Sequence, residues 1–190
     1  MSTTLTPGFA DPVLDAQLCF RAVLDAMARP GRIRTVQGVS APPPLCDAAA
    51  AVLLTLADHE TPLWLDPDSA NARAWIAFHT GAPLAPAREA MFALALSLPN
   101  PAEFHAGTDE MPETAATIIL QVASLTTGHR FLLEGPGLRD HAVLQVDGLP
   151  PDFCPIWQRN HALFPRGIDL ILCSSNKLTA LPRSVSVKDA

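Results

Sequence analysis

Positive charge is scarce in this chain, and lysine is nearly absent. The 190 residues carry 13 lysines and arginines against 19 aspartates and glutamates, which gives a formal net charge of −6. Lys177 and Lys188 are the only lysines, and the sequence has no basic tail and no arginine-rich run. Nucleic-acid binding depends on a basic patch that displaces counterions from phosphates. The sequence therefore predicts a protein that does not bind nucleic acid.

Long apolar segments and export signals are absent as well. No run approaches the roughly 18 apolar residues of a membrane-spanning helix, and residues 1–9 contain neither the basic nor the apolar stretch of a secretory signal. The cysteines form no C-x-x-C pair and lie far apart, at Cys19, Cys46, Cys154 and Cys173. In a chain without an export signal, such cysteines are usually reduced and structural. We expect a cytoplasmic protein with no membrane segment.

Compact catalytic motifs are also missing. The chain has no G-x-G-x-x-G and no G-x-x-x-x-G-K-[ST] nucleotide loop. None of its six histidines forms an H-x-x-x-H pair, so no metal site is predicted. His79 is expected at a helix end, where a cation interacts favourably with the helix dipole, and residues 58–60 are expected to form a solvated capping turn. We therefore expect no metal, no cofactor and no independent catalytic site.

The composition leaves two interpretations open. Hydrophobic residues make up 48% of the chain and charged residues only 17%. In the first interpretation, a partner covers part of the surface. In the second, the values reflect the many alanines, which count as hydrophobic but bury little area.

Periodicity and turn residues predict one α/β domain over residues 1–190. Asp11 and Pro12 favour a helix start at that point, and glycine and proline punctuate the remaining segments. The expected helices span residues 12–29, 48–57 (capped by Asp47), 67–79 and 152–161, and the expected strands span residues 32–36, 63–65, 91–96, 116–124, 131–133, 143–146, 168–173 and 184–187. This mixed order predicts a three-layer αβα sandwich around a mixed sheet. The close spacing of strands 116–124, 131–133 and 143–146 predicts an antiparallel meander.

Two segments carry residue types that suggest ligand chemistry. The Gly135-Pro136-Gly137 turn follows a strand, and its backbone N–H groups are suited to an anion. Arginines beside tight turns extend this hypothesis, and the candidate anion-binding set is Arg29, Arg32, Gly135, Gly137, Arg166 and Arg183.

The S-x-x-K match from Ser174 to Lys177 has three interpretations. It is typical of an acyl-transfer serine with a lysine base, or of a pyridoxal-phosphate lysine after a strand. The first requires a helix after the serine, and the second requires an acidic partner and a phosphate cup that the sequence does not reveal. The third interpretation, a solvated loop lysine, is favoured.

An ordered series of segments resembles one known family. The segments are residues 7–13, 20–31, 54–65, 78–83, 107–110, 135–137, 164–172 and 180–183. Together they resemble the PhnH family of the carbon–phosphorus lyase system, from about residue 8 to residue 187. Each block is weakly specific, but their order over nearly the whole chain is specific.

The resemblance implies a role in phosphonate catabolism. Members of the PhnH family belong to a core complex with subunits G, I and J, which forms ribose 1-methylphosphonate 5-triphosphate from a nucleoside triphosphate and methylphosphonate. The family resembles pyridoxal-phosphate-dependent transferases in fold without using the cofactor, and it forms a homodimer when isolated. No catalytic set carries over, so we expect a supporting or scaffolding subunit without independent activity. The alternative is a stand-alone small-molecule transferase or lyase of that fold, acting through Lys177.

Overall fold

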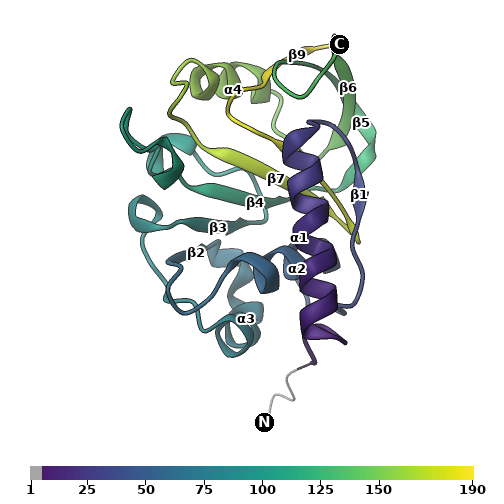
Figure 1. The fold of residues 1–190 in the computed structure, drawn as a ribbon, viewed down its shortest axis with the longest axis vertical. Coiled ribbons are helices and arrows are strands. Elements are labelled where there is room, and N and C mark those ends of the chain that lie inside the picture. Colours follow the sequence, from purple (N-terminus) through teal and green to yellow (C-terminus); the bar gives the residue numbers. More distant parts are fainter. Residues whose placement is uncertain (1–5) are drawn as a thin grey trace.

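A six-stranded mixed sheet organises residues 6–190, the part of the chain that the computed structural model describes (Figure 1). The strands, in spatial order, are β1 (Arg34–Thr35), β8 (Lys177–Leu181), β7 (Asp169–Ser174), β4 (Thr117–Gln121), β3 (Phe92–Ala95) and β2 (Leu63–Leu65). Strands β2, β3, β4 and β7 run parallel, and β8 is antiparallel to both of its neighbours. The predicted α/β class and mixed sheet are confirmed.

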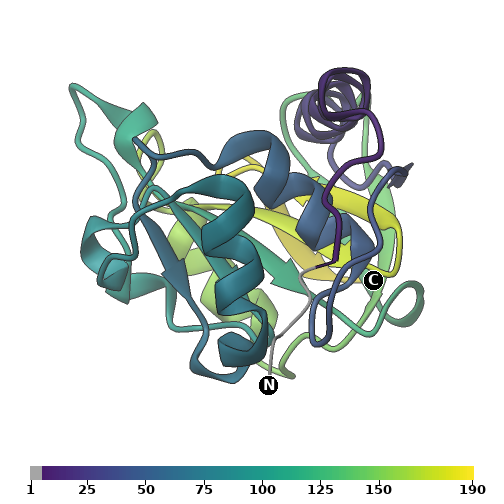
Figure 2. The same ribbon diagram turned by 90° about the horizontal axis from the view of Figure 1, so that it is seen from below.

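Helices cover one face of this sheet: α1 (Pro12–Ala28), α2 (Asp47–Leu56) and α3 (Arg73–Thr80). Figure 2 shows α1 and α2 together on one side. Helix α1 begins where predicted, because the Asp11 carboxylate accepts hydrogen bonds from the backbone N–H groups of Val13 and Leu14. The α3 segment is preceded by a 3-10 helix, Pro67–Ala72, which the Asp66 side chain caps.

A second, smaller sheet covers the opposite face together with α4 (Phe153–His161). It is antiparallel and has the order β6 (Ala142–Asp147), β5 (Ser124–Glu134) and β9 (Ser186–Asp189). Three layers are therefore present, but strands fill much of the layer that was expected to be helical.

Alternating side chains of the central strands build two separate cores. In β4, Ile119 faces the helices, while Ile118 and Leu120 face the small sheet. Strand β7 alternates in the same way, with Ile171 toward the helices and Leu172 toward the small sheet. A strand buried on both faces is mostly apolar, which explains the nearly all-apolar run predicted over residues 168–173, where Asp169 is the one charged residue.

Two strand predictions were wrong. The meander does not form, because β4 lies in the large sheet between β3 and β7, and the third partner in the small sheet is β9. Strand β8 was missed, since residues 177–181 resemble a loop. Ser175 adopts a positive φ of 53°, and the chain turns within two residues to pair β8 with β7.

Two local predictions also need correction. Cys46, not Asp47, is the residue before α2, and Asp47 is the first helical residue, whose carboxylate accepts a hydrogen bond from Ala41 N–H. The strand expected over residues 32–36 is reduced to Arg34–Thr35.

The sequence predicts no export signal in residues 1–9. Residues 1–5 of that segment lie outside the described residues. Within residues 6–190, no helix combines the length and apolar character that crossing a bilayer requires.

Replacing Asn160 tests the link between α4 and β7. Its buried amide donates to the carbonyl of Ile168 (2.9 Å) and accepts from the Ile168 N–H (2.8 Å). Asn160→Ala leaves both backbone groups without a partner, so we expect the free energy of unfolding in urea to fall by about 2–4 kcal/mol. The exposed neighbour Gln158→Ala is the control and should change it by less than about 0.5 kcal/mol. Equal losses in the two variants would contradict this account.

Candidate functional site

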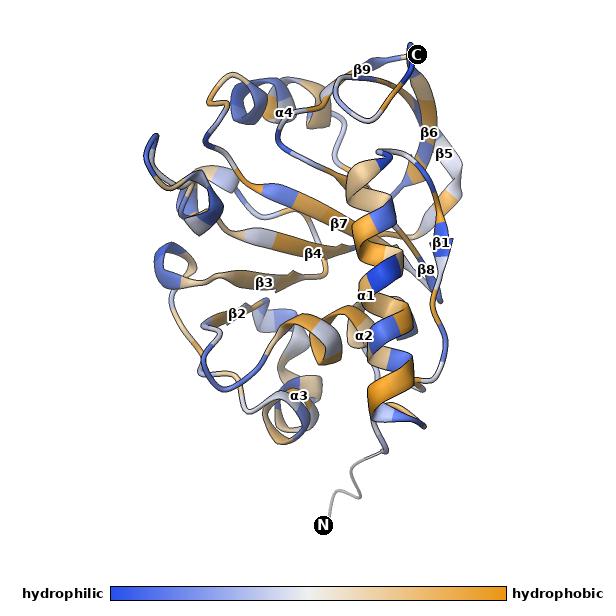
Figure 3. Ribbon diagram, in the orientation of Figure 1, coloured by the Kyte–Doolittle hydropathy of each residue, from blue (hydrophilic) through white to orange (hydrophobic). Residues whose placement is uncertain are grey.

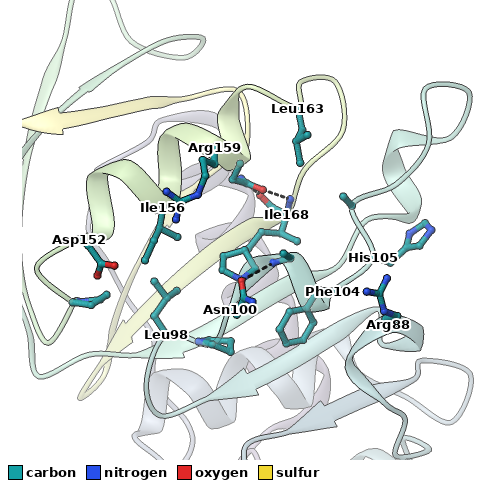
Figure 4. Close-up of a pocket in the computed structure, with 16 residues that line it drawn as sticks. Arg88, Leu98, Asn100, Phe104, His105, Asp152, Ile156, Arg159, Leu163 and Ile168 are labelled. Carbon is teal, nitrogen blue, oxygen red and sulfur yellow. Dashed lines mark hydrogen bonds between the residues drawn. The ribbon is translucent and has the colours of Figure 1, made fainter.

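A pocket of about 800 Å³ lies between α4 and the chain that connects β3 to β4 (Figure 4). This volume falls in the range of small-molecule sites, roughly 300–1,000 Å³. Its lining is mostly apolar and includes Leu98, Phe104, Ile156, Leu163 and Ile168. The polar lining residues are Arg88, Asn100, His105, Asp152, Arg159 and Asn160.

Local sequence chemistry holds one wall of this pocket in place. The Asn100 side chain accepts a hydrogen bond from Ala102 N–H (3.2 Å) and starts a single 3-10 turn, Pro101–Glu103. Phe104 follows the turn, points inward and packs edge-on against Trp64, with 5.5 Å between ring centroids. The next residues are tied to the large sheet, since the His105 carbonyl accepts from Ala116 N–H (2.8 Å). The pocket is therefore built on the sheet and not on a free loop.

Two arginine side chains border the pocket. Arg88 lies in the short 3-10 helix Ala87–Glu89, and Arg159 projects from α4. Neither side chain forms an ion pair or a hydrogen bond with any residue in the 6–190 range. His105 lies beside Arg88 in Figure 4, and its Nδ1 is 3.2 Å from both the Thr114 carbonyl and the Gly107 nitrogen. Sequence reasoning missed this pocket, because its residues meet only through the tertiary fold.

The first group of predicted site residues lies at the C-terminal end of α1. Asp25 pairs with Arg29, with Arg34 and, at 3.7 Å, with Arg32. Partial burial raises the pKa of the Asp25 carboxyl, but the hydrogen bond from Arg34 and the charges of all three arginines outweigh burial and lower it. Arg34, which the sequence hypothesis did not include, is thus part of this cluster.

The two predicted glycines belong to the turn between β5 and β6, which lies against the same helix end. Gly137 has a φ of 85°, and a side chain there would meet the Ala28 carbonyl. A Cβ on Gly135 would lie 2.9 Å from the Ser184 carbonyl oxygen. Close backbone packing therefore accounts for both glycines.

Arg166 and Arg183 form a second group at the start of β7. The Arg183 guanidinium binds both carboxylate oxygens of Asp169, at 2.5 and 3.1 Å, and donates to the Pro112 carbonyl at 2.6 Å. Arg166 Nε lies 3.2 Å from Asp109 Oδ1. The six candidates thus fall into two groups, and each arginine among them has a carboxylate partner.

The serine and lysine of the S-x-x-K match are cross-strand partners. Ser174 pairs with Lys177 in the β7–β8 hairpin, and its hydroxyl donates to the Ala123 carbonyl (3.0 Å). Lys177 is exposed, and no helix follows the serine. A serine–lysine nucleophile does not fit this geometry, and neither does a pyridoxal-phosphate cradle, which requires an enclosed lysine.

The remaining nucleophile and metal candidates have structural surroundings. Burial raises the pKa of all four thiols, and for Cys154 it does so to about 11, with help from Asp189. A thiol with a raised pKa is a poor nucleophile near neutral pH. His79 lies in the last turn of α3, which confirms its predicted place at a helix end. Its ring is tilted by 55° against that of Trp75, and its Nε2 is 3.0 Å from the Thr6 carbonyl oxygen. Within residues 6–190, no three potential metal ligands come together.

Comparison with known proteins decides the family. The model of the bacterial phosphonate metabolism protein family (PhnH) matches residues 7–188. The chain belongs to the PhnH family. It is 41% identical over 187 residues to the alpha-D-ribose 1-methylphosphonate 5-triphosphate synthase subunit PhnH of Rhizobium meliloti (strain 1021), covering 95% of this chain and 94% of the relative. It is 32% identical to the putative C-P lyase subunit protein HtxG of Stutzerimonas stutzeri, covering 90% and 85%. The resemblance seen in the sequence is confirmed.

Substitutions of the two arginines at the start of β7 should have different effects on stability. The Arg183–Asp169 pair is nearly buried, with 13% and 12% of the side chains exposed, so Arg183→Gln leaves an unpaired carboxylate inside and should cost about 3 kcal/mol in urea unfolding. Arg166 is half-exposed, and Arg166→Gln should cost less than about 1 kcal/mol. A small loss for Arg183→Gln would show that this arginine is not structural.

Proposed function

We propose that this PhnH-family chain is a subunit of the enzyme complex that makes ribose 1-methylphosphonate 5-triphosphate during phosphonate catabolism. The observation that carries the proposal is the match to a synthase subunit over 95% of the chain and 94% of the relative. The second relative supports the same assignment, since it is named as a putative subunit of a C-P lyase.

A supporting role within the complex fits the described side chains. Lys177 is exposed in the β7–β8 hairpin, and the Ser174 hydroxyl donates to a backbone carbonyl. Burial raises the pKa of the four cysteine thiols, which makes them poor nucleophiles. We propose that the chain contributes surface and ligand contacts, while the catalytic groups belong to partner subunits. Subunits G, I and J are the proposed partners, the isolated chain is proposed to form a homodimer, and the cytoplasm is the proposed location.

The outward face of α1 is the proposed partner surface. It exposes five large apolar side chains, each between 46% and 76% exposed: Val13, Leu14, Leu18, Phe20 and Leu24. Figure 3 shows apolar residues along the length of α1. The exposed polar residues Gln17 and Arg21 lie among them on the same helix. Exposed apolar side chains in this number are nevertheless typical of a protein contact. It also fits the low charged fraction of the chain, 17%.

We further propose that the fold is related to that of pyridoxal-phosphate-dependent transferases and has no cofactor site. A parallel core with an antiparallel strand at one side supports the relation. The exposed position of Lys177 in the β7–β8 hairpin supports the absence of a cofactor lysine.

Co-purification tests the subunit assignment. When the chain carries an affinity tag and is co-expressed with subunits G, I and J, we expect all four to elute together in size-exclusion chromatography. A chain that elutes without the other three would contradict the proposal.

Charge on the α1 face should weaken the assembly. The double substitution Leu18→Glu and Leu24→Glu places two carboxylates in an apolar contact, so we expect at least a tenfold loss of recovered partner. Phe78→Glu is the matched control, because Phe78 is a 69% exposed apolar residue on another helix, α3. Far-ultraviolet circular dichroism checks that all variants fold. Equal recovery with both variants would place the contact elsewhere on the chain.

A further inference from the structure

We propose that the pocket between α4 and the β3–β4 connection binds an organic phosphate or phosphonate, with the anionic head near Arg88 and His105 and an apolar body on the pocket floor. The inference concerns a ligand of this chain alone. It therefore does not depend on the proposed assembly with other subunits.

The floor of the pocket is a rigid apolar surface. Phe104 and Ile168 are 4% and 1% exposed and belong to the core under the small sheet. Leu98 and Ile156 complete the floor from the connection and from α4 (Figure 4). A ligand with an aromatic or alkyl body gains by covering this surface, since burial of apolar area is favourable in proportion to the area removed from water.

The arginines at the rim of the pocket differ in their contacts from the arginines of the two groups described above. Arg29, Arg32, Arg34, Arg166 and Arg183 each have a carboxylate partner. Arg88 and Arg159 have no such partner in the 6–190 segment. The same is true of Arg21, Arg73, Arg130 and Arg139, but of these six arginines only Arg88 and Arg159 line this pocket. Guanidinium groups match the oxygens of phosphate and phosphonate in a planar, bidentate way. The chain as a whole is acidic, so this local positive charge stands out against its net charge of −6.

The charged lining also orients the ligand. Asp152, the residue before α4, places a carboxylate in the lining. Arg88 and His105 lie together on the opposite side of the pocket in Figure 4. Repulsion from Asp152 directs the anionic head toward Arg88 and His105. The Asp152 end is then suited to a hydroxyl or amino group of the ligand, because a carboxylate accepts hydrogen bonds.

The size of the pocket favours a ligand larger than a simple phosphate or phosphonate ion. Methylphosphonate and inorganic phosphate have no body that reaches across an apolar floor in a cavity of about 800 Å³. Phenylphosphonate and a nucleoside monophosphate such as AMP share a phosphoryl dianion on a larger, partly apolar body. Both should bind at least tenfold more tightly than inorganic phosphate.

Isothermal titration calorimetry on the full chain tests the site, with inorganic phosphate, methylphosphonate, phenylphosphonate and AMP as probes. We expect saturable binding of both phenylphosphonate and AMP, and the tighter of the two indicates whether the natural ligand is an organophosphonate or a nucleotide. Because the anionic head is placed at Arg88, the single substitution Arg88→Gln should weaken that binding at least tenfold. Arg139→Gln is the matched control, an exposed arginine outside the pocket, and should leave binding unchanged.

Several results would overturn the site. One is the absence of saturable binding for every probe at millimolar concentration. Another is equal affinity for inorganic phosphate and the larger anions. The third is full binding by the Arg88→Gln variant when circular dichroism shows that it is folded. The absence of binding would also be expected if the pocket receives a segment of a partner subunit instead of a small molecule. Because the titration uses the chain alone, failure here leaves the subunit assignment standing, and failure of co-purification leaves the site standing.

Discussion

Burial of the central parallel strands on both faces is the constraint on which the rest of the structure depends. Strands β4 and β7 place successive apolar side chains into two different cores, so each face needs its own cover. Helices α1, α2 and α3 cover one face, and α4 with the β5–β6–β9 sheet covers the other. Because parallel strands require long connections, the chain must cross back outside the sheet between β3 and β4. That connection forms one wall of the pocket.

The same arrangement separates structural arginines from available ones. Arg183 links the start of β7 to the residue 107–114 segment through Asp169 and Pro112, and the arginines at the end of α1 share Asp25. These contacts hold the end of α1 and the 107–114 segment against the sheet. Arg88 and Arg159 remain without partners among the described residues, and both border the concave apolar surface. The lack of a partner within residues 6–190, together with a place in the pocket lining, therefore distinguishes these two arginines from the stabilising ones.

Local sequence signals predicted the elements but not their neighbours. Asp11 and Pro12 located the start of α1, and Gly81 ends α3 with a left-handed φ of 67°, because these effects act within one turn. Strand pairing depends on distant residues, so the predicted meander failed where β9, more than 50 residues after β5, took the third position. Strand β8 was missed because its turn uses Ser175, a residue that rarely adopts a positive φ.

The family could be predicted from ordered short segments, since their order is preserved over almost the whole chain. The pocket could not, because Arg88, His105 and Arg159 lie in three separate segments that carry no motif. The central claim is that this chain acts as a subunit in phosphonate catabolism, and genetic replacement tests it most directly. When the chain replaces the PhnH subunit of Rhizobium meliloti, to which it is 41% identical, growth with methylphosphonate as the only phosphorus source should be restored. Absence of growth, with the chain present as soluble protein and normal growth on phosphate, would contradict the account.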